Sequence, residues 1–397
     1  MARCFNRRNA AGILGGMRSD DTLASSPKGR VRGVLRAMLH RLGLVLFGVL
    51  LAALALEVVL RVWDAVPEVG SPLYGFHDTD ADLGWAGKPN VRLRYHRPEF
   101  DTLVELDAAG WRKPQPSVPA DPMHRVLVLG DSYTWGWGVA QGELFTDRLQ
   151  VQLAPTVAVY NRGVIGFGTA QEYLLLKREL AAHRYDTVVL MFYLNDIADN
   201  IDGKDGHRPY FDLLNGGLVP RNQPTLARTS PVRLFFRDHS RAYMFLEFEI
   251  GMLKRRFKGE AEDEREYKEV AAIDFHDLPG YEVTARLLGE MNRLVRAHGA
   301  RFFLVYIPHR SEVEHATGYP YARAVRAMID DIAQREGITV IDLRGPFRAH
   351  AEAKQTLVYP IDGHWTPAGH QLAATVLRSS PIFAQSDAAG ETQADRP

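Results

Sequence analysis

Four short segments of the chain carry side chains that could together perform acyl transfer. They are Gly130-Asp131-Ser132, residues 161–166, Leu194-Asn195-Asp196 and Asp362-Gly363-His364. A serine hydroxyl attacks a carbonyl only when a base such as histidine takes its proton and later returns it to the leaving alcohol. The two-residue spacing of Asp362 and His364 places both side chains on one face of an extended segment. Ser132, His364 and Asp362 are therefore the candidate nucleophile, base and orienting acid.

The positions of these segments relative to the predicted strands strengthen that interpretation. Ser132 alone is better explained as an ordinary N-cap serine of a helix. However, residues 161–166 follow a second predicted strand, residues 194–196 follow a third, and residues 362–364 precede the last predicted helix. A doubly wound sheet brings such segments together at the carboxyl ends of its strands, where active sites form.

Strand and helix patterns alternate along most of the chain. Short apolar runs rich in β-branched residues predict buried strands at residues 125–130, 156–160, 187–194, 301–308 and 339–343. Amphipathic patterns predict helices at residues 143–153, 169–183, 282–298 and 321–336. A last helix begins at Pro367, behind Thr366 as its N-cap. This alternation predicts an α/β fold with a parallel sheet covered by helices on both faces.

In these segments the sequence resembles the SGNH (GDSL-type) hydrolase family. The four blocks of that family contribute a serine, a glycine, an asparagine and an Asp/His pair, in this order. The resemblance covers about residues 124–380 apart from an insertion, and Gly-Asp-Ser-Tyr-Thr at residues 130–134 matches the first block. It implies a flavodoxin-like three-layer α/β/α fold and a serine esterase that needs no cofactor. No ligand spacing in the sequence indicates a metal site.

The same resemblance implies a site for the oxyanion of the tetrahedral intermediate. Gly166 corresponds to the family's oxyanion glycine, and Asn195 to its asparagine. The candidate donors are the backbone N–H groups of Ser132 and Gly166 and the side-chain amide of Asn195. The sequence departs from the family pattern at two places. Tyr193 stands where the commoner Gly-x-Asn-Asp pattern has glycine, and the spacing Asp-x-His stands where many members have Asp-x-x-His. The second variant resembles members that modify bacterial polysaccharides, such as alginate O-acetyltransferases.

Other polar and aromatic residues near these blocks have structural explanations. Asp131 and Asp196 are expected to organise their turns by hydrogen bonds to the backbone. His370 is expected to pack within the last helix, and His309 is expected to be a structural or surface residue, with lining of the site as its functional alternative. The two tryptophans at residues 135 and 137 are expected in the core, and a wall of the substrate pocket is the functional alternative.

Charge is distributed unevenly along the chain. The 397 residues hold 48 Lys and Arg against 48 Asp and Glu, so no overall basic excess favours nucleic acid as a partner. Residues 1–41 nevertheless hold nine basic side chains against Asp20 and Asp21, a net charge of +7. The single cysteine, Cys4, excludes an intramolecular disulfide and a cysteine-ligated zinc site.

An apolar run follows this basic arm. Residues 42–60 contain no charge except Glu57, and at about 1.5 Å per residue they span roughly 30 Å, the thickness of a bilayer core. The sequence therefore predicts one membrane-spanning helix at residues 42–63, closed by Arg61 as a partner for Glu57 and by Trp63 at the interface. The positive-inside rule places the arm in the cytoplasm and the rest of this inner-membrane protein in the periplasm or outside the cell. A cleaved signal peptide ending near residues 53–55 is the alternative.

The predicted organisation has five parts. Residues 1–41 form a disordered basic arm, residues 42–63 the spanning helix, residues 64–122 a small β-rich lead-in, residues 123–380 the hydrolase domain with an insertion at about residues 197–280, and residues 381–397 a disordered tail. Within the insertion, the densely charged residues 254–269 predict a solvated helix, and a cap over the site is the alternative.

Three functions are compatible with these observations. The leading hypothesis is a membrane-anchored serine esterase that hydrolyses a short-chain acyl ester. The first alternative is an acyltransferase or deacetylase acting on a cell-envelope polysaccharide. The expected partners are an acyl-ester substrate and the membrane, and in this alternative also a glycan. The second alternative is an inert envelope scaffold, against which the presence of all five candidate residues argues.

Overall fold

The computed structural model describes residues 27–63, 75–97, 99–201, 208–221, 273–314, 320–353 and 356–384, and part of residues 232–253. The chain divides into two compact units, Met1–Val59 and Leu60–Pro397. All the strands among the described residues belong to the second unit.

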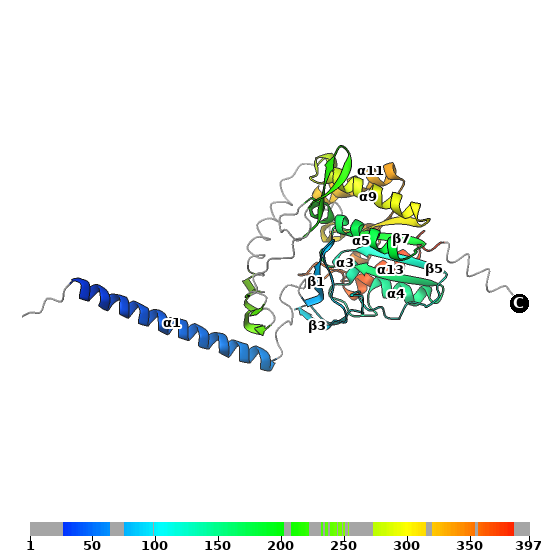
Figure 1. Ribbon diagram of the computed structural model, residues 1–397. Helices are drawn as coiled ribbons and strands as arrows, with labels where there is room; N and C mark the ends of the chain where they lie inside the picture. The colour runs from blue at the N-terminus through cyan, green and yellow to red at the C-terminus, as the bar shows by residue number, and fades with distance from the viewer. Residues whose placement is uncertain are drawn as a thin grey trace, which may run out of the picture. The chain divides into compact units, whose positions relative to one another are not determined.

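One long helix, α1 (Pro27–Trp63), occupies the N-terminal part of the described chain (blue in Figure 1). Its stretch Leu35–Val62 contains an 18-residue window with a mean hydropathy of 2.6, so the helix is long and apolar enough to cross a membrane. The prediction of a disordered arm is wrong from Pro27 onward. Proline is favourable as a first helical residue, and the Arg, Leu, Ala and Met residues that follow favour helix. Residues 1–26 lie outside the described residues.

The five predicted strands form one parallel sheet. They are β5 (His124–Gly130), β6 (Val157–Gly163), β7 (Thr187–Phe192), β10 (Arg301–Tyr306) and β11 (Thr339–Asp342). Their spatial order is β11-β10-β7-β5-β6, and every neighbouring pair is parallel. The chain therefore runs from β5 outward to β6 and then returns to β7 on the other side of β5, which is the flavodoxin-like order. The point between β5 and β7 is the topological switch point, where such folds bind their ligands.

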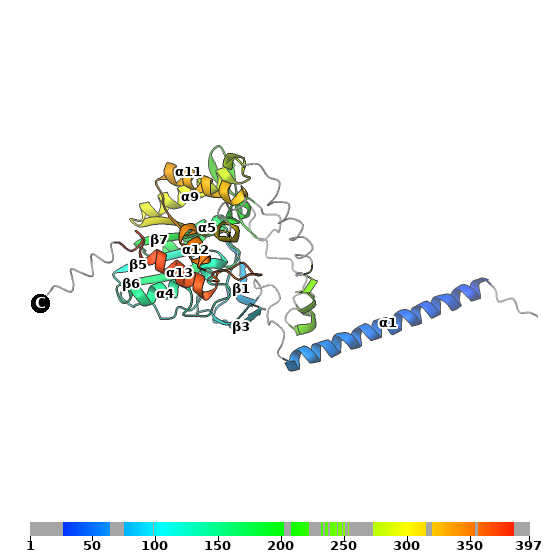
Figure 2. The same ribbon diagram turned by 180° about the vertical axis from the view of Figure 1, so that it is seen from behind.

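Helices cover both faces of this sheet (Figures 1 and 2). One face carries α4 (Phe145–Leu153), α12 (Arg344–Glu352) and α13 (Pro367–Arg378), and the other carries α5 (Thr169–Ala182), α9 (Tyr281–Ala297) and α11 (Pro320–Glu336). Successive strand residues point to opposite layers, so Val126 and Val128 pack toward α4 while Leu127 and Leu129 pack toward α5. The three-layer α/β/α fold is confirmed.

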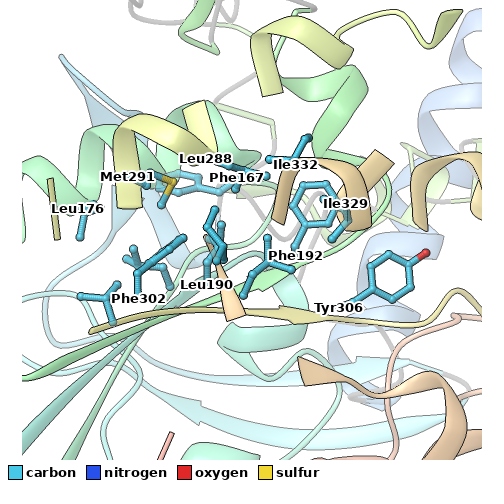
Figure 3. Packing of buried hydrophobic residues seen from close by; sticks show 14 of the residues in the cluster. Phe167, Leu176, Leu190, Phe192, Leu288, Met291, Phe302, Tyr306, Ile329 and Ile332 are labelled. Carbon is cyan, nitrogen blue, oxygen red and sulfur yellow. The ribbon is translucent and has the colours of Figure 1, made fainter. Parts of the chain in front are cut away.

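Figure 3 shows the packing in the layer between the sheet and α5, α9 and α11. Its labelled residues include Leu176, Leu288, Met291, Ile329 and Ile332 from the helices and Leu190, Phe192, Phe302 and Tyr306 from the strands. Each fully buried side chain of this size contributes about 1.5–3 kcal/mol through removal of apolar surface from water. This layer therefore supplies a rigid support for the loops at the carboxyl ends of the strands.

Two antiparallel hairpins precede the sheet. They are β1 (His77–Asp80) with β2 (Gly84–Gly87), and β3 (Arg92–Arg97) with β4 (Phe100–Glu105). Aromatic side chains of this region, Phe76, Tyr95 and Phe100, form one buried cluster with Trp137 and Tyr359 of the core. The hairpins therefore pack against loops that carry the candidate site residues.

The insertion and the tail are described in part. After α6 (Asp196–Asp199) come the hairpin of β8 (Tyr210–Leu214) and β9 (Gly217–Arg221) and a short 3-10 helix, η1 (Phe275–Asp277). The charged helix predicted at residues 254–269 lies outside the described residues. The tail starts later than the predicted residue 381, because the apolar Ile382 and Phe383 are buried in the layer that contains α13. Residues 385–397 lie outside the described residues.

Candidate active site

Ser132 lies at the turn between β5 and the short helix α3 (Ser132–Trp135). Asp131 caps this helix, since its Oδ1 accepts the N–H of Tyr133 at 2.9 Å, which confirms the predicted turn. The helix packs directly on the end of β6. A Cβ at Gly163 would lie 2.3 Å from the backbone nitrogen of Trp135, so only glycine permits this approach. Ser132 is thereby fixed at the switch point of the sheet.

A continuous line of hydrogen bonds joins the three candidate residues of the triad. The Oγ of Ser132 lies 2.7 Å from Nε2 of His364, although the two residues are 232 positions apart in the chain. The Nδ1 of His364 lies 2.6 Å from Oδ1 of Asp362. When Nδ1–H donates to the carboxylate, Nε2 is left as the acceptor for the serine proton. His364 and Asp362 keep 22% and 21% of their side chains exposed, so the line reaches solvent.

The loop that carries Asp362 and His364 is held from two sides. Glu99, in the turn between β3 and β4, accepts the backbone N–H groups of Ile361 at 2.9 Å and Asp362 at 2.7 Å. On the other side, the hydroxyl of Tyr133 donates to the carbonyl of Gly363 at 3.0 Å. Carboxylate hydrogen bonds to backbone N–H groups are among the stronger ones in proteins. The lead-in therefore contributes directly to the geometry of the site.

The end of this loop leads into α13 as predicted. Thr366 is the N-cap, and its hydroxyl accepts the N–H of Gly369 at 3.3 Å, with Pro367 at the first helical position. The start of α13 is therefore fixed three residues after His364.

Trp137 contacts both Asp362 and His364. Its Nε1–H donates to Oδ2 of Asp362 at 3.0 Å, and its ring stacks on the imidazole with ring centroids 5.4 Å apart. Burial alone would raise the pKa of Asp362, but hydrogen bonds from His364 and Trp137 outweigh it and hold this pKa below its ordinary value. Trp137 is 8% exposed, so it is a core residue, as expected, and also a hydrogen-bond donor to the candidate triad.

The candidate oxyanion donors lie at the same edge of the sheet. In the register of the strands, Gly130 lies opposite Gly163 on β6 and Met191 on β7, so the turns that follow these three strands meet. Ser132 is the first residue of α3, and its N–H has no acceptor within that helix. Gly166 stands in the turn after β6 with φ +75°, a conformation that favours glycine. Asn195 precedes α6, and its Nδ2 donates to Oδ2 of Asp199 at 3.0 Å.

Three carboxyl groups are buried next to these turns. Asp131 precedes Ser132, Asp196 follows Asn195, and Glu172 lies on α5; they are 3%, 0% and 0% exposed. Burial is the main cause that raises the pKa of all three, that of Asp131 to about 6. The Oδ2 of Asp196 accepts the N–H of Tyr193 at 3.3 Å, which confirms its predicted role in the turn.

These carboxyl groups are not arranged as metal ligands. Within the described residues, no group of three or more His, Cys, Asp or Glu side chains is placed to hold a metal ion. Within the same part of the chain, neither carboxyl oxygen of Glu172 has a hydrogen-bond partner.

The two further histidines considered in the sequence, His309 and His370, lie at different places in the fold. His370 is buried in α13, where its Nδ1 accepts the N–H of Phe145 at 3.2 Å, and burial lowers its pKa to about 3. The Nδ1 of His309 lies 2.8 Å from Oγ of Ser311. Its ring stacks on Tyr193, which in turn packs against Tyr133 with centroids 4.8 Å apart. The tyrosine that replaces the usual glycine thus places an aromatic ring beside the nucleophile turn.

Sequence reasoning missed several residues that organise the site. They are Trp85, Glu99, Asp199 and Arg208, together with the hydrogen bond that Trp137 makes to Asp362. The only signal was the pair of tryptophans just after the serine. The others lie outside the four segments, where no local pattern marks them.

Comparisons with known proteins identify the family of the chain. Residues 128–372 match the profile of the GDSL-like lipase/acylhydrolase family. No curated protein sequence matches the chain.

The chain also shows similarity to solved structures. The chain is 13% identical to a lipolytic G-D-S-L family protein from Veillonella parvula DSM 2008, over 64% of this chain and 94% of that one, with a TM-score of 0.38. It is 12% identical to the psychrotrophic esterase EstA from Pseudoalteromonas sp., over 65% of this chain and 96% of that one, with a TM-score of 0.37. It is 14% identical to the acetyl xylan esterase AlAXEase, over 64% of this chain and 98% of that one, with a TM-score of 0.38. Because the family match covers more than half of the chain and spans Ser132 to His364, the chain belongs to the GDSL-like lipase/acylhydrolase (SGNH) family, whose members hydrolyse ester bonds.

Proposed function

We propose that this protein is a serine esterase that hydrolyses short-chain acyl esters through Ser132, His364 and Asp362. The observation that carries the proposal is the line of hydrogen bonds from Ser132 through His364 to Asp362. It has the geometry that a base-activated serine needs, because the imidazole nitrogen lies within hydrogen-bond reach of the hydroxyl.

The proposed reaction proceeds in two halves. Ser132 Oγ forms a bond to the ester carbonyl carbon while its proton moves to Nε2 of His364. The tetrahedral intermediate then expels the alcohol, which takes the proton back from His364, and an acyl-enzyme remains. Water repeats the sequence with the same proton transfers and releases the carboxylic acid. Asp362 holds the imidazole in its tautomer and stabilises the imidazolium that forms in each half.

The oxyanion in this proposal is stabilised by three donors. They are the N–H groups of Ser132 and Gly166 and the side-chain amide of Asn195, which lie at one edge of the sheet. Fixed donors of this kind stabilise charge that develops only in the transition state, and loss of one costs about 100-fold in kcat.

Labelling with a fluorophosphonate probe tests the nucleophile. The wild-type protein should be labelled, and Ser132→Ala and His364→Ala should abolish labelling together with turnover of p-nitrophenyl acetate. Ser311→Ala is a matched control, because Ser311 is another serine beside a histidine ring nitrogen, and it should be labelled like wild type. Labelling that survives in Ser132→Ala would refute the proposed nucleophile, and an unlabelled wild type would favour the inert scaffold.

A second candidate function is acyl transfer to a glycan of the cell envelope. The observation that favours it is the Asp-x-His spacing of Asp362 and His364, in which both side chains still reach each other at 2.6 Å. In this reaction a sugar hydroxyl replaces water in the second half, and His364 accepts its proton. Incubation with an acetyl ester and an oligosaccharide acceptor should then yield acetylated sugar at the expense of free acetate. Release of acetate alone with every acceptor would leave hydrolysis as the function.

The location we propose is the cytoplasmic membrane, with the catalytic domain on its outer side. The apolar α1 and the net charge of +7 on residues 1–41 support this orientation. Cys4, the only cysteine, offers a direct test in intact spheroplasts with a membrane-impermeant maleimide. Cys4 should react only after lysis, whereas a Cys4→Ser/Asp82→Cys variant should react before it, since Asp82 is 79% exposed. The reverse pattern would refute the orientation, and loss of Cys4 from the mature protein would indicate a cleaved signal peptide.

A further inference from the structure

Two residues from outside the four family blocks donate hydrogen bonds to the peptide groups on either side of Gly166. The Nε1–H of Trp85, in β2, donates to the carbonyl oxygen of Ile165 at 2.9 Å. The Nη2 of Arg208, in the insertion, donates to the carbonyl oxygen of Gly166 at 3.0 Å. The guanidinium of Arg208 also lies over the Trp85 ring, with its Cζ 5.7 Å from the ring centroid.

These contacts bear on the direction of the Gly166 N–H. In a trans peptide the N–H points opposite to the preceding carbonyl, so fixing the Ile165 oxygen also fixes the Gly166 N–H. Gly166 has a positive φ of 75° and no side chain to restrict its rotation. A bond to each neighbouring carbonyl therefore replaces the restriction that a side chain would have supplied.

Arg208 also reaches Asn195, through Asp199. Its Nη1 forms an ion pair with Oδ1 of Asp199, and Oδ2 of Asp199 accepts one N–H of the Asn195 amide at 3.0 Å. A carboxylate only accepts hydrogen bonds, so the Asn195 amide cannot reverse its ends without losing this bond. The second N–H of the amide remains for another acceptor.

The ion pair has an electrostatic consequence as well. Without Arg208, the Asp199 carboxylate beside the Asn195 amide would lose a cationic partner and would repel more strongly the negative charge that develops on a bound ester. The Arg208 guanidinium offsets the negative charge of Asp199. Because Arg208 is only 14% exposed, little water screens this interaction.

We propose that Arg208 and Trp85 are positioning residues of the oxyanion site, so that the insertion and the lead-in both take part in catalysis. This inference rests on the proposed esterase mechanism. Arg208 holds Gly166 directly and Asn195 through Asp199, and Trp85 fixes the peptide that carries the Gly166 N–H. Both residues act through others and need not touch the substrate.

The test compares Arg208→Met with a matched control, Arg221→Met, in the full-length protein. Arg221 forms a similar ion pair with Asp212 within the same insertion, but on the hairpin of β8 and β9. With p-nitrophenyl acetate, Arg208→Met should lower kcat about 10-fold and leave KM within threefold, because the donors are misplaced rather than removed. Arg221→Met should keep the wild-type kcat. Equal rates for both variants would overturn the proposal.

Two further variants separate positioning from simple loss of folding. Asp199→Asn/Arg208→Met removes the negative charge that has lost its Arg208 partner and should recover part of the kcat lost in Arg208→Met. Trp85→Phe keeps an aromatic ring but removes the donor, and it should lower kcat several-fold while the acidic limb of the pH–rate profile stays in place. Failure of the double variant to recover any activity, together with a wild-type kcat in Trp85→Phe, would refute the inference.

The outcome is distinguishable from failure of the proposed function. If the wild-type protein is labelled at Ser132 by the fluorophosphonate and Arg208→Met keeps full kcat, only the positioning role is wrong. If wild type is not labelled, the esterase mechanism itself is wrong.

Discussion

Trp137 lies against both His364 and Asp362, the candidate base and acid. Its Nε1–H satisfies the Oδ2 of Asp362, while the Oδ1 of that carboxylate faces His364. Because the two oxygens have different partners, the carboxylate cannot rotate without losing one of them. A charge-assisted hydrogen bond of this kind contributes about 1.5–3 kcal/mol.

We therefore expect Trp137→Phe to lower kcat/KM by about 10-fold. Phenylalanine keeps a ring against His364 but cannot donate to Asp362, so the pKa of Asp362 should rise and the imidazolium should lose part of its stabilisation. Esterase assays from pH 6 to 9 measure the effect. Trp111→Phe is the control, since Trp111 contacts Arg162 and not the triad, and equal rates for the two variants would contradict the argument.

At the scale of elements, the β3–β4 hairpin acts as a support for the catalytic loop. Its turn places Glu99 against the backbone of Ile361 and Asp362, which are more than 260 positions away in the chain. The hairpin itself is anchored by Tyr95 and Phe100 in the aromatic cluster with Trp137 and Tyr359. The loop thus inherits its rigidity from an element outside the sheet.

A graded pair of variants tests this support. Glu99→Ala removes both acceptor oxygens and should lower kcat about 10-fold. Glu99→Gln keeps one acceptor oxygen, and its kcat should lie between those of Glu99→Ala and wild type. Asp101→Asn, on the same hairpin but in a surface ion pair with Arg94, should be neutral. An unchanged kcat in Glu99→Ala would show that the loop needs no support from the hairpin.

The elements of the core could be predicted from the sequence because each has a local cause. Unbroken apolar runs predicted all five strands, and Thr366 and Pro367 predicted the start of α13. The approach of Ser132 to His364 followed from the parallel sheet order. The contacts of Glu99 and Arg208 could not be predicted, since they join side chains across long chain separations by tertiary packing alone. The helical start at Pro27 was missed because Gly29, Gly33 and the dense basic residues made the segment look like a disordered arm, although its apolar residues recur at helical spacing from Val31 onward.

For the molecule as a whole, the buried carboxyl groups link stability to pH. Glu172 has no hydrogen-bond partner for either oxygen within the described residues, and burial raises its pKa well above the ordinary value of 4.5. Well below pH 4.5 the group is protonated in both states and adds no pH dependence to the free energy of unfolding. As the pH rises beyond that value, the unfolded chain releases the proton while the folded protein keeps it, so the free energy of unfolding falls until the folded pKa is reached.

Glu172→Gln should therefore raise the Tm at pH 8, with a gain that shrinks toward pH 4.5. Each pH unit in this window changes the free energy of unfolding by about 1.4 kcal/mol per group. Glu179→Gln is the control of opposite sign, because Glu179 on the same helix pairs with Arg162 at 3.2 Å and should lose Tm when neutralised. Thermal unfolding between pH 4.5 and 8 measures both. A lower Tm for Glu172→Gln at pH 8 would contradict the expected cost of this carboxyl group.

The hydrogen bonds from Trp85 and Arg208 to the peptide groups around Gly166 also limit how this protein can be re-engineered. Loops far from the nucleophile are the usual material for exchanging specificity between relatives, since they are assumed to change recognition and leave chemistry alone. Here a chimera that receives a foreign insertion would lose the guanidinium on the Gly166 carbonyl and leave Trp85 without its cationic neighbour. Grafts should therefore keep arginine at position 208 with tryptophan at position 85, and libraries that vary one of the two should vary the other with it.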